Sequence, residues 1–197
     1  MLDLGAGSWI YVHKNYIKDS KVIAEALSGY KPQIRHTVKM MGKDVQIPRY
    51  QQAFGKSYTY TGNTSQSIPF IPILDTLKKD IVDQMKQVLP DLDPTLFDYN
   101  MALVNWYEDG TQYIGPHSDD TKQLVKDSTI GSITIGASRD FVLTPKKGID
   151  GKSVKISLDD GDFVIMGGKC QDTHLHSVPK RLKCKSERIN ITFRVFA

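Results

Sequence analysis

The sequence predicts an α+β protein in which helices come first and a double-stranded β-helix, or jelly roll, follows. Two apolar stripes at helical spacing occur before residue 90. From about residue 99 onward, short strand-like runs alternate with glycine and aspartate. Many short strands joined by turns favour a sandwich or barrel, and we expect the helices to brace one outer face. We therefore expect one domain over residues 1–197, with the helices in about 1–98 and the jelly-roll core in about 99–197.

The length and composition are those of a single globular domain. The chain has 197 residues, of which 40% are apolar and 24% charged, and its net charge is +4. No apolar run suggests a membrane span or a secretory signal, and residues 1–7 resemble an untargeted amino terminus. Cys170 and Cys184 could pair on spacing alone, but two cysteines make no disulfide framework. We expect an intracellular monomer without a membrane partner, nuclear if the source is eukaryotic and cytoplasmic otherwise.

Two helices are predicted in the first half. Asp19 could cap the first, which would run to about Leu27 and stop at Ser28-Gly29. The second ends before Pro90, and its apolar stripe consists of Ile73, Leu74, Leu77, Ile81, Met85 and Val88.

Seven strands are predicted in the second half, each bounded by turn-forming residues. They cover residues 101–107, 113–119, 130–136, 141–144, 154–158, 163–166 and 188–196.

The last predicted strand alternates strictly between polar and apolar residues. One face would present Arg188, Asn190, Thr192 and Arg194. An edge strand with a solvated polar face would give the same pattern. Two arginines on one face would also suit a ligand with two carboxylates, because guanidinium binds carboxylate in a bidentate manner. Asn105 and Tyr107 share a face of the 101–107 strand and could add an amide and a phenol, although Tyr107 would fit equally well as a core aromatic.

A metal site is suggested by His117 and Asp119, which would point to the same face of a strand. By itself this H-x-D pattern is weak, because chance supplies it often. Either His174 or His176 could provide a second imidazole, and strand geometry alone does not choose between them. Two imidazoles and one carboxylate leave coordination positions open on iron(II).

Several motifs occur together in a fixed order. They are Asn105-Trp106-Tyr107-Glu108-Asp109-Gly110, His117-Ser118-Asp119-Asp120, Ser132-Ile133-Thr134-Ile135-Gly136-Ala137-Ser138-Arg139-Asp140-Phe141, Gly161-Asp162-Phe163-Val164-Ile165-Met166, His176-Ser177-Val178-Pro179 and Arg188-Ile189-Asn190-Ile191-Thr192-Phe193-Arg194. Upstream lie Ile47-Pro48-Arg49 and Thr59-Tyr60-Thr61-Gly62. Over residues 38–196 the chain closely resembles the AlkB family of iron(II)/2-oxoglutarate dioxygenases, and most of all the eukaryotic branch that repairs alkylated bases in duplex DNA.

The resemblance implies roles for the residues of the site. His117, Asp119 and His176 match the iron ligands, whereas His174 does not. The positions that match the 2-oxoglutarate site are Asn105, Tyr107, Arg188 and Arg194, with Asn190 lining the same cavity. Arg188 is expected to bind the distal carboxylate alongside Tyr107. Arg194, helped by Asn105, is expected beside the carboxylate nearest the metal.

The resemblance also implies a reaction and a partner. With Fe(II), 2-oxoglutarate and O2, the expected activity is oxidative demethylation of N-alkylated bases such as 1-methyladenine and 3-methylcytosine, which releases formaldehyde, succinate and CO2. An alkylated base lies inside the stack, so the enzyme has to flip it out. The expected partner is alkylated DNA, single- or double-stranded, with RNA as an alternative.

A nucleotide-recognition lid in the first half is part of the same resemblance. Tyr58 and Tyr60 match pocket positions that could stack on the flipped base, or they could simply share one face of a strand. Met41, in a hairpin over residues 38–43, takes the place of an aromatic finger that fills the gap in the duplex, although core packing would explain it too.

Three further positions bear on substrate binding. Asp120 could read the exocyclic amine of the base or merely cap a turn. Thr121 stands where the duplex-repair branch of the family has a glutamate, and this difference bears on which lesions are preferred. Arg139 could contact phosphates together with the cations at 180–185, which could equally form a solvated basic loop.

Two rival functions come from other classes. A zinc-stabilised DNA-binding module could use Cys170, His174, His176 and Cys184, although their spacing resembles no common zinc site. The second rival is a dioxygenase of the same chemistry that acts on proteins or small molecules.

Overall fold

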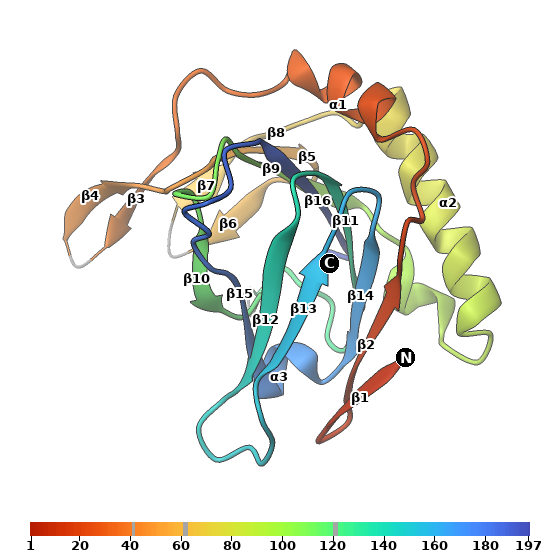
Figure 1. Cartoon of the computed structure of the whole chain (residues 1–197). Coiled ribbons are helices and arrows are strands. Elements are labelled where there is room, and N and C mark those ends of the chain that lie inside the picture. Colours follow the sequence, from red (N-terminus) through yellow and green to blue (C-terminus); the bar gives the residue numbers. More distant parts are fainter. Residues whose placement is uncertain (41, 61–62, 120–121) are drawn as a thin grey trace.

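Two β-sheets face each other, and two helices cover the outer face of the larger sheet (Figure 1). This computed structural model describes residues 1–40, 42–60, 63–119 and 122–197. The helices are α1 (Ser20–Ser28) and α2 (Pro72–Val88), which agree with the two predicted helices. Asp19 precedes α1, but its side chain makes no capping hydrogen bond. In the described ranges, no helix combines the length and apolar composition that crossing a membrane requires.

The larger sheet has eight strands in the order β1-β2-β14-β11-β16-β9-β5-β8. Their bounds are β1 Leu2–Gly5, β2 Ser8–His13, β14 Phe163–Gly168, β11 Ile130–Gly136, β16 Arg188–Arg194, β9 Met101–Tyr107, β5 Tyr50–Gly55 and β8 Ser67–Ile68. Neighbouring strands are antiparallel except β5 and β8, which are parallel.

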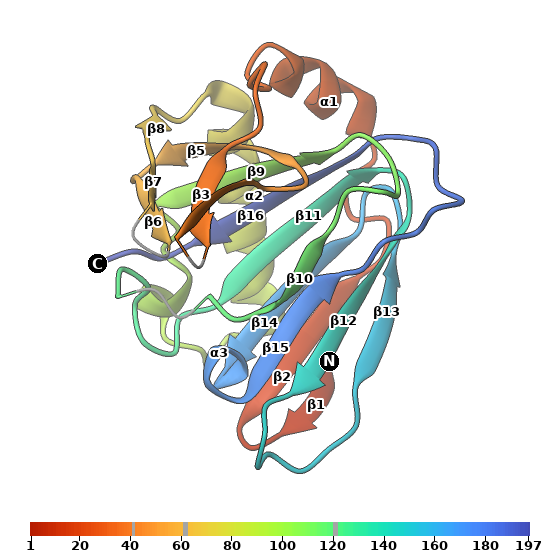
Figure 2. The same ribbon diagram turned by 90° about the vertical axis from the view of Figure 1, so that its left-hand side faces the viewer.

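The smaller sheet has four strands in the order β10-β15-β12-β13. They are β10 Ile114–His117, β15 His174–Val178, β12 Arg139–Pro145 and β13 Val154–Leu158. Two hairpins, β3 (Thr37–Met40) with β4 (Lys43–Gln46) and β6 (Tyr58–Tyr60) with β7 (Asn63–Ser65), lie on the same side of the molecule as β10 (Figure 2). A 3-10 helix, η1 (Pro94–Phe97), precedes β9, and a short helix, α3 (Cys170–Thr173), joins β14 to β15.

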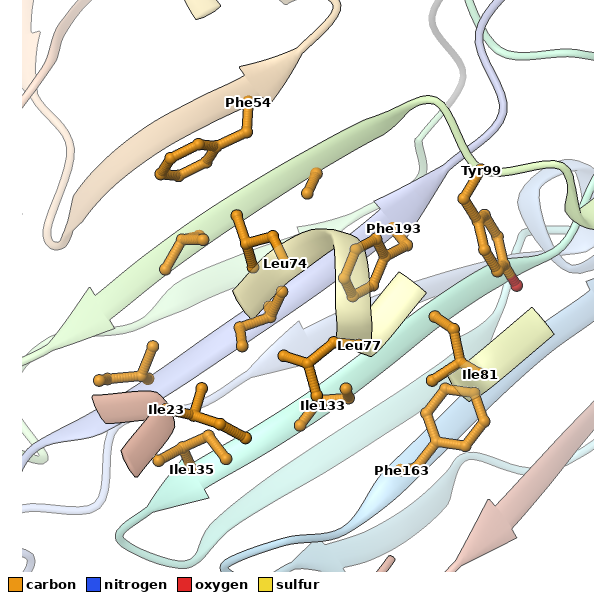
Figure 3. Close-up of a cluster of buried hydrophobic side chains, with 14 of the residues drawn as sticks. Ile23, Phe54, Leu74, Leu77, Ile81, Tyr99, Ile133, Ile135, Phe163 and Phe193 are labelled. Atoms are coloured by element: carbon orange, nitrogen blue, oxygen red, sulfur yellow. The ribbon is translucent and has the colours of Figure 1, made fainter. Parts of the chain in front are cut away.

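The principal core lies between the helices and the larger sheet (Figure 3). Leu74, Leu77 and Ile81 of α2 and Ile23 of α1 pack against sheet side chains that include Phe54, Ile133, Ile135, Phe163 and Phe193. A second cluster, with Phe141, Leu143, Val164 and Met166, fills part of the space between the sheets. Alternate side chains of each central strand are therefore buried on opposite faces.

Strand β16 shows the consequence of this arrangement. Its apolar residues, Ile189, Ile191 and Phe193, belong to the core beneath the helices, so its polar face points between the two sheets. The strand is central, between β11 and β9, and the alternative of a solvated edge strand is wrong.

The jelly-roll core and its helical brace are confirmed, but the division near residue 98 is not a structural boundary. Strands β2 and β5 come from the first half, yet they lie in the larger sheet beside β14 and β9. The segment of β2, Ser8–His13, contains aromatic and β-branched residues that suit a strand. Its partner β14 is more than 140 residues away, and such pairing leaves no local pattern in the sequence.

Candidate metal and cosubstrate site

Three predicted metal ligands meet between the ends of two strands of the smaller sheet. His117 ends β10 and lies directly opposite His176 of β15. Asp119 follows two residues after β10 ends, so it is not held by the strand ladder that the prediction assumed. Its Oδ1 lies 3.7 Å from His117 Nε2 and 4.0 Å from His176 Nε2. One ligand atom from each of the three residues lies within 4.8 Å of the others, as a shared metal ion requires.

The carboxylate of Asp119 is buried and has one oxygen in use. Arg194 Nε donates to Oδ2 at 2.8 Å, and its Nη2 lies 2.7 Å from the same oxygen as an ion pair. The other oxygen, Oδ1, is buried and has no hydrogen-bond partner within the described structure. Burial by itself would raise the pKa of this carboxyl group, but Arg194 and the two imidazoles outweigh it and hold the pKa well below its usual range. Asp119 is therefore charged, with a free oxygen facing the histidines.

The two imidazoles are held in the form that binds metals. Burial and the neighbouring His117 lower the pKa of His176 to about 3, and burial also lowers the pKa of His117. Both rings are therefore neutral at pH 7. Nδ1 of His117 lies 2.9 Å from the carbonyl of Gly115, a contact in which Nδ1 donates and the Nε2 lone pair stays free. Two neutral imidazoles and one unpaired carboxylate oxygen fit a divalent iron ion.

A cavity of about 410 Å³ opens beside this triad. Four of the five residues predicted to hold 2-oxoglutarate line it: Asn105, Tyr107, Asn190 and Arg194. They come from β9 and β16, which are paired in the larger sheet so that Asn105 lies opposite Asn190 and Tyr107 opposite Arg188. The cavity therefore joins polar side chains of the larger sheet to the metal ligands near the smaller one.

Arg188, the fifth residue, is fully buried next to Tyr107. Its guanidinium carbon lies 5.5 Å from the centre of the Tyr107 ring, and Nη2 donates to Thr134 Oγ1 and Asn190 Oδ1 at 2.9 and 2.8 Å. Nε and Nη1 are buried without a partner among the residues described. Burial lowers the pKa of Arg188 to about 10, so the side chain is still charged at pH 7. A buried cation with two open donors fits a carboxylate group.

Arg139 is not where the prediction of a phosphate contact places it. Its side chain is 1% exposed and donates to the backbone carbonyls of Gln112 and Pro179 at 2.8 and 2.7 Å, with a longer contact to Asp109. It ties together the loops that follow β9 and β15. Arg139 shares a face of β12 with buried Phe141, and this alternation was the overlooked signal that it points inward.

Cations do lie exposed in the basic loop, residues 180–185. Lys180 Nζ lies over the ring of Tyr113, which lines the cavity, at 4.9 Å from the ring centre. Two backbone hydrogen bonds fix the loop to Gly110: Arg181 donates to its carbonyl at 2.8 Å, and the Gly110 amide donates to Cys184 at 2.9 Å. The loop is therefore anchored close to the mouth of the cavity.

Arg49 is a site residue to which the sequence assigned no role. Its Nε donates to Asn105 Oδ1 at 2.9 Å, and its side chain lines the cavity. Burial is the main cause of the lowered pKa of His117; the charge of Asp119 raises that pKa, and the charge of Arg49 helps to lower it. The motif Ile47-Pro48-Arg49 was the signal that could have pointed to it.

The substrate-binding predictions for the lid fall mostly outside what the structure describes. Met41, Asp120 and Thr121 lie outside the described residues. Tyr58 and Tyr60 lie on β6, but only their backbone belongs to the described part.

The zinc alternative does not agree with the structure. Cys170 and Cys184 are free thiols whose Sγ atoms lie 3.3 and 3.5 Å from the carbonyls of Trp9 and Ser186, and His174 Nδ1 lies 2.8 Å from Thr173 Oγ1. Within the described ranges, the group of potential ligands that comes together is His117, Asp119 and His176.

Known proteins resemble this chain over most of its length. It is 33% identical over 167 residues to DNA oxidative demethylase ALKBH2 of Homo sapiens, which covers 80% of this chain and 60% of the relative. It is 30% identical over 223 residues to DNA oxidative demethylase ALKBH2 of Arabidopsis thaliana, and the match covers 98% of this chain and 68% of that protein. It is 33% identical over 156 residues to alpha-ketoglutarate-dependent dioxygenase alkB homolog 3 of Mus musculus, and the match covers 75% of this chain and 51% of that protein. The chain thus spans about 60% of the length of the human relative.

A solved structure and a family model agree with these relatives. The structure of OsALKBH1 superposes with a TM-score of 0.67 at 20% identity, covering 94% of this chain and 97% of that one, which shows a shared fold. The model described as the 2OG-Fe(II) oxygenase superfamily matches residues 13–194. The chain therefore belongs to the 2OG-Fe(II) oxygenase superfamily and, within it, to the AlkB homologues.

Proposed function

We propose that this protein oxidatively demethylates N-alkylated bases in DNA. The observation that carries the proposal is the unpaired, buried Oδ1 of Asp119, which faces two neutral imidazoles at the edge of a cavity lined by Asn105 and Tyr107. When bound there, Fe(II) with 2-oxoglutarate and O2 supplies the oxidising chemistry that turns an N-methyl group into formaldehyde, with succinate and CO2 as the other products.

The residues of this chain would bind and orient the cosubstrate. Arg188 offers two open donors for the distal carboxylate, with Tyr107 beside it. Asn105 would assist at the carboxylate nearer the metal, and Arg49 fixes Asn105 through a hydrogen bond to its amide oxygen. Arg194, which holds the ligand Asp119 through a hydrogen bond, would lie beside the same carboxylate of 2-oxoglutarate. Fixing both reactants in one geometry is the main contribution that these side chains make.

Support for a nucleic-acid substrate comes from the relatives and from charge. The curated relatives include DNA oxidative demethylases, and the basic loop near the cavity mouth could contact phosphates without reading sequence. Val38 of β3 also lines the cavity, so the β3–β4 hairpin that precedes and follows Met41 lies above the site. We further propose that Tyr58 and Tyr60 stack on the flipped base and that Asp120 recognises it. Met41 would insert into the gap that the flipped base leaves.

The test is a demethylation assay on defined oligonucleotides. Purified protein, Fe(II), ascorbate and 2-oxoglutarate are mixed with strands that carry 1-methyladenine or 3-methylcytosine, single- and double-stranded, as DNA and as RNA. Loss of the methyl mass on DNA supports the proposal. Succinate formation without demethylation of any strand would refute a nucleic-acid substrate. Demethylation of RNA alone would show that RNA, and not DNA, is the substrate.

Two variants test the ligand assignment in the same assay. His117→Ala should abolish turnover, because it removes one of the three ligands. His174→Ala is the matched control, since His174 is another buried histidine of the same sheet whose Nδ1 contacts Thr173. Turnover of the His117 variant at the wild-type rate would overturn the metal site.

A further inference from the structure

The backbone of Asp119 is held by a side chain that the proposed reaction does not use. The amide N–H of Asp119 donates to Oε1 of Gln171 at 2.8 Å, across 52 residues of sequence. Gln171 belongs to α3, and its Nε2 lies 3.8 Å from Sδ of Met166, which lines the main cavity. The amide of Gln171 thus lies between a ligand of the triad and the wall of the cavity.

Asp119 needs such a contact because the sheet does not hold it. Strand β10 ends at His117, so the ladder hydrogen bonds stop two residues before the carboxylate ligand. Arg194 fixes Oδ2 from the side-chain end. The direction of Oδ1 also depends on where the backbone of Asp119 lies, and Gln171 holds that backbone through its amide N–H. One anchor on the carboxylate and one on the amide together define the position of the ligand atom.

Helix α3 is a firm base for this contact. Lys146 Nζ donates to the carbonyl of Gln171 at 2.8 Å, and the Lys146 amide donates to Thr173, also at 2.8 Å. The next residue, His174, begins β15, which carries His176. Gln171 therefore connects Asp119 to the element that supplies another ligand of the same triad.

We propose that Gln171 is a positioning residue for the metal site: its amide oxygen places the backbone of Asp119 so that Oδ1 points at His117 and His176. The proposal rests on the metal site of the proposed function and extends it to a residue outside the triad. Asp119 and Gln171 also line a separate cavity of about 220 Å³. Water in that cavity could replace a lost acceptor, so removal of Gln171 should disturb the ligand geometry far more than the stability of the fold.

Metal affinity is the measurement that separates positioning from a structural role. Gln171→Met keeps the length of the side chain and removes the acceptor, whereas Gln171→Glu keeps an acceptor oxygen. Asp172→Asn is the control, because Asp172 is an exposed neighbour on α3 that also lines the 220 Å³ cavity. Co(II), as a probe for the site, is titrated into each anaerobic protein by visible absorption, and thermal unfolding of the metal-free proteins is recorded in parallel.

Gln171→Met should weaken Co(II) binding by roughly 10- to 100-fold, which is typical for the loss of a residue that orients a metal ligand. Gln171→Glu should bind Co(II) much more tightly than Gln171→Met, and the control should match wild type. Equal affinity of Gln171→Met and wild type would overturn the proposal, as would equal weakening by Met and Glu.

Failure of the metal site itself gives a different result. Wild-type protein would then not bind Co(II), or His117→Ala would bind it as tightly as wild type. If Gln171→Met does not fold, Gln171→Asn takes its place, because a side chain shorter by one methylene withdraws the acceptor from Asp119. The same outcomes then support or overturn the positioning role.

Discussion

Replacing Arg194 by methionine should destabilise the metal-free protein strongly. Arg194 and Asp119 form an ion pair whose side chains are only 6% and 2% exposed; Nη2 lies 2.7 Å from Oδ2, and Nε donates to the same oxygen at 2.8 Å. Methionine has a similar length but no donor, so Arg194→Met leaves a buried carboxylate without its cation. A hydrogen bond to a charged group contributes about 1.5–3 kcal/mol, and breaking a buried ion pair costs about 3–5 kcal/mol. We therefore expect Arg194→Met to lower the free energy of unfolding by about 3–5 kcal/mol.

Urea unfolding of the metal-free protein measures this loss. The controls are Asp119→Asn and the double variant, which together close a double-mutant cycle. Because the two side chains act on each other, the double variant should be less destabilised than the sum of the single variants. A loss below about 1 kcal/mol for Arg194→Met, the level of an exposed pair, would refute the reasoning. Strict additivity in the cycle would do the same.

Three further outcomes follow from the packing of single residues. Iodoacetamide should label Cys184 and spare Cys170 in the folded protein, as read by peptide mass, because burial raises the pKa of the Cys170 thiol; equal labelling would contradict this. Gly110→Ala should speed trypsin cleavage in the basic loop, since an added Cβ would lie 1.7 Å from the carbonyl oxygen of Arg181. Unchanged cleavage would mean that the loop is not anchored there. Leu77→Ala should lower the free energy of unfolding by about 2–5 kcal/mol in urea, and a cost under about 1 kcal/mol would show that the core beneath α2 collapses around the gap.

Local patterns predicted the elements whose signal is contained in their own residues. The strand predicted over 188–196 is confirmed over Arg188–Arg194, because strict alternation over many positions is typical of a strand and of no helix. Helix α2 followed from its apolar stripe. Strand β2 was missed, although its residues suit a strand, because what makes it part of the sheet is its pairing with β14. Pairing between distant segments has no counterpart in local sequence.

The same distinction applies to the site. His117 and His176 were predicted from motifs, and they face each other across β10 and β15. Arg139 was predicted to contact phosphates together with the cations at 180–185, yet it is buried, and its Nη1 and Nη2 donate to three backbone carbonyls inside the protein. The contact of Gln171 with Asp119 could not be predicted, since it joins a short helix to the segment after β10, 52 residues away in sequence.

The last strand of the chain, β16, lies in the middle of the larger sheet, between β11 and β9. A ribosome makes both neighbours before it reaches residue 188, so the edges of β11 and β9 that pair with β16 stay unpaired in the nascent chain until β16 is made. Unpaired strand edges of this kind invite aggregation during synthesis, and sheets closed by distant segments fold slowly. A nonsense mutation after β14 ends at Gly168 and before β16 begins at Arg188 would leave two half sheets as well as remove Arg188 and Arg194. Such a mutation should therefore give degraded protein rather than a folded chain that binds metal but not its cosubstrate.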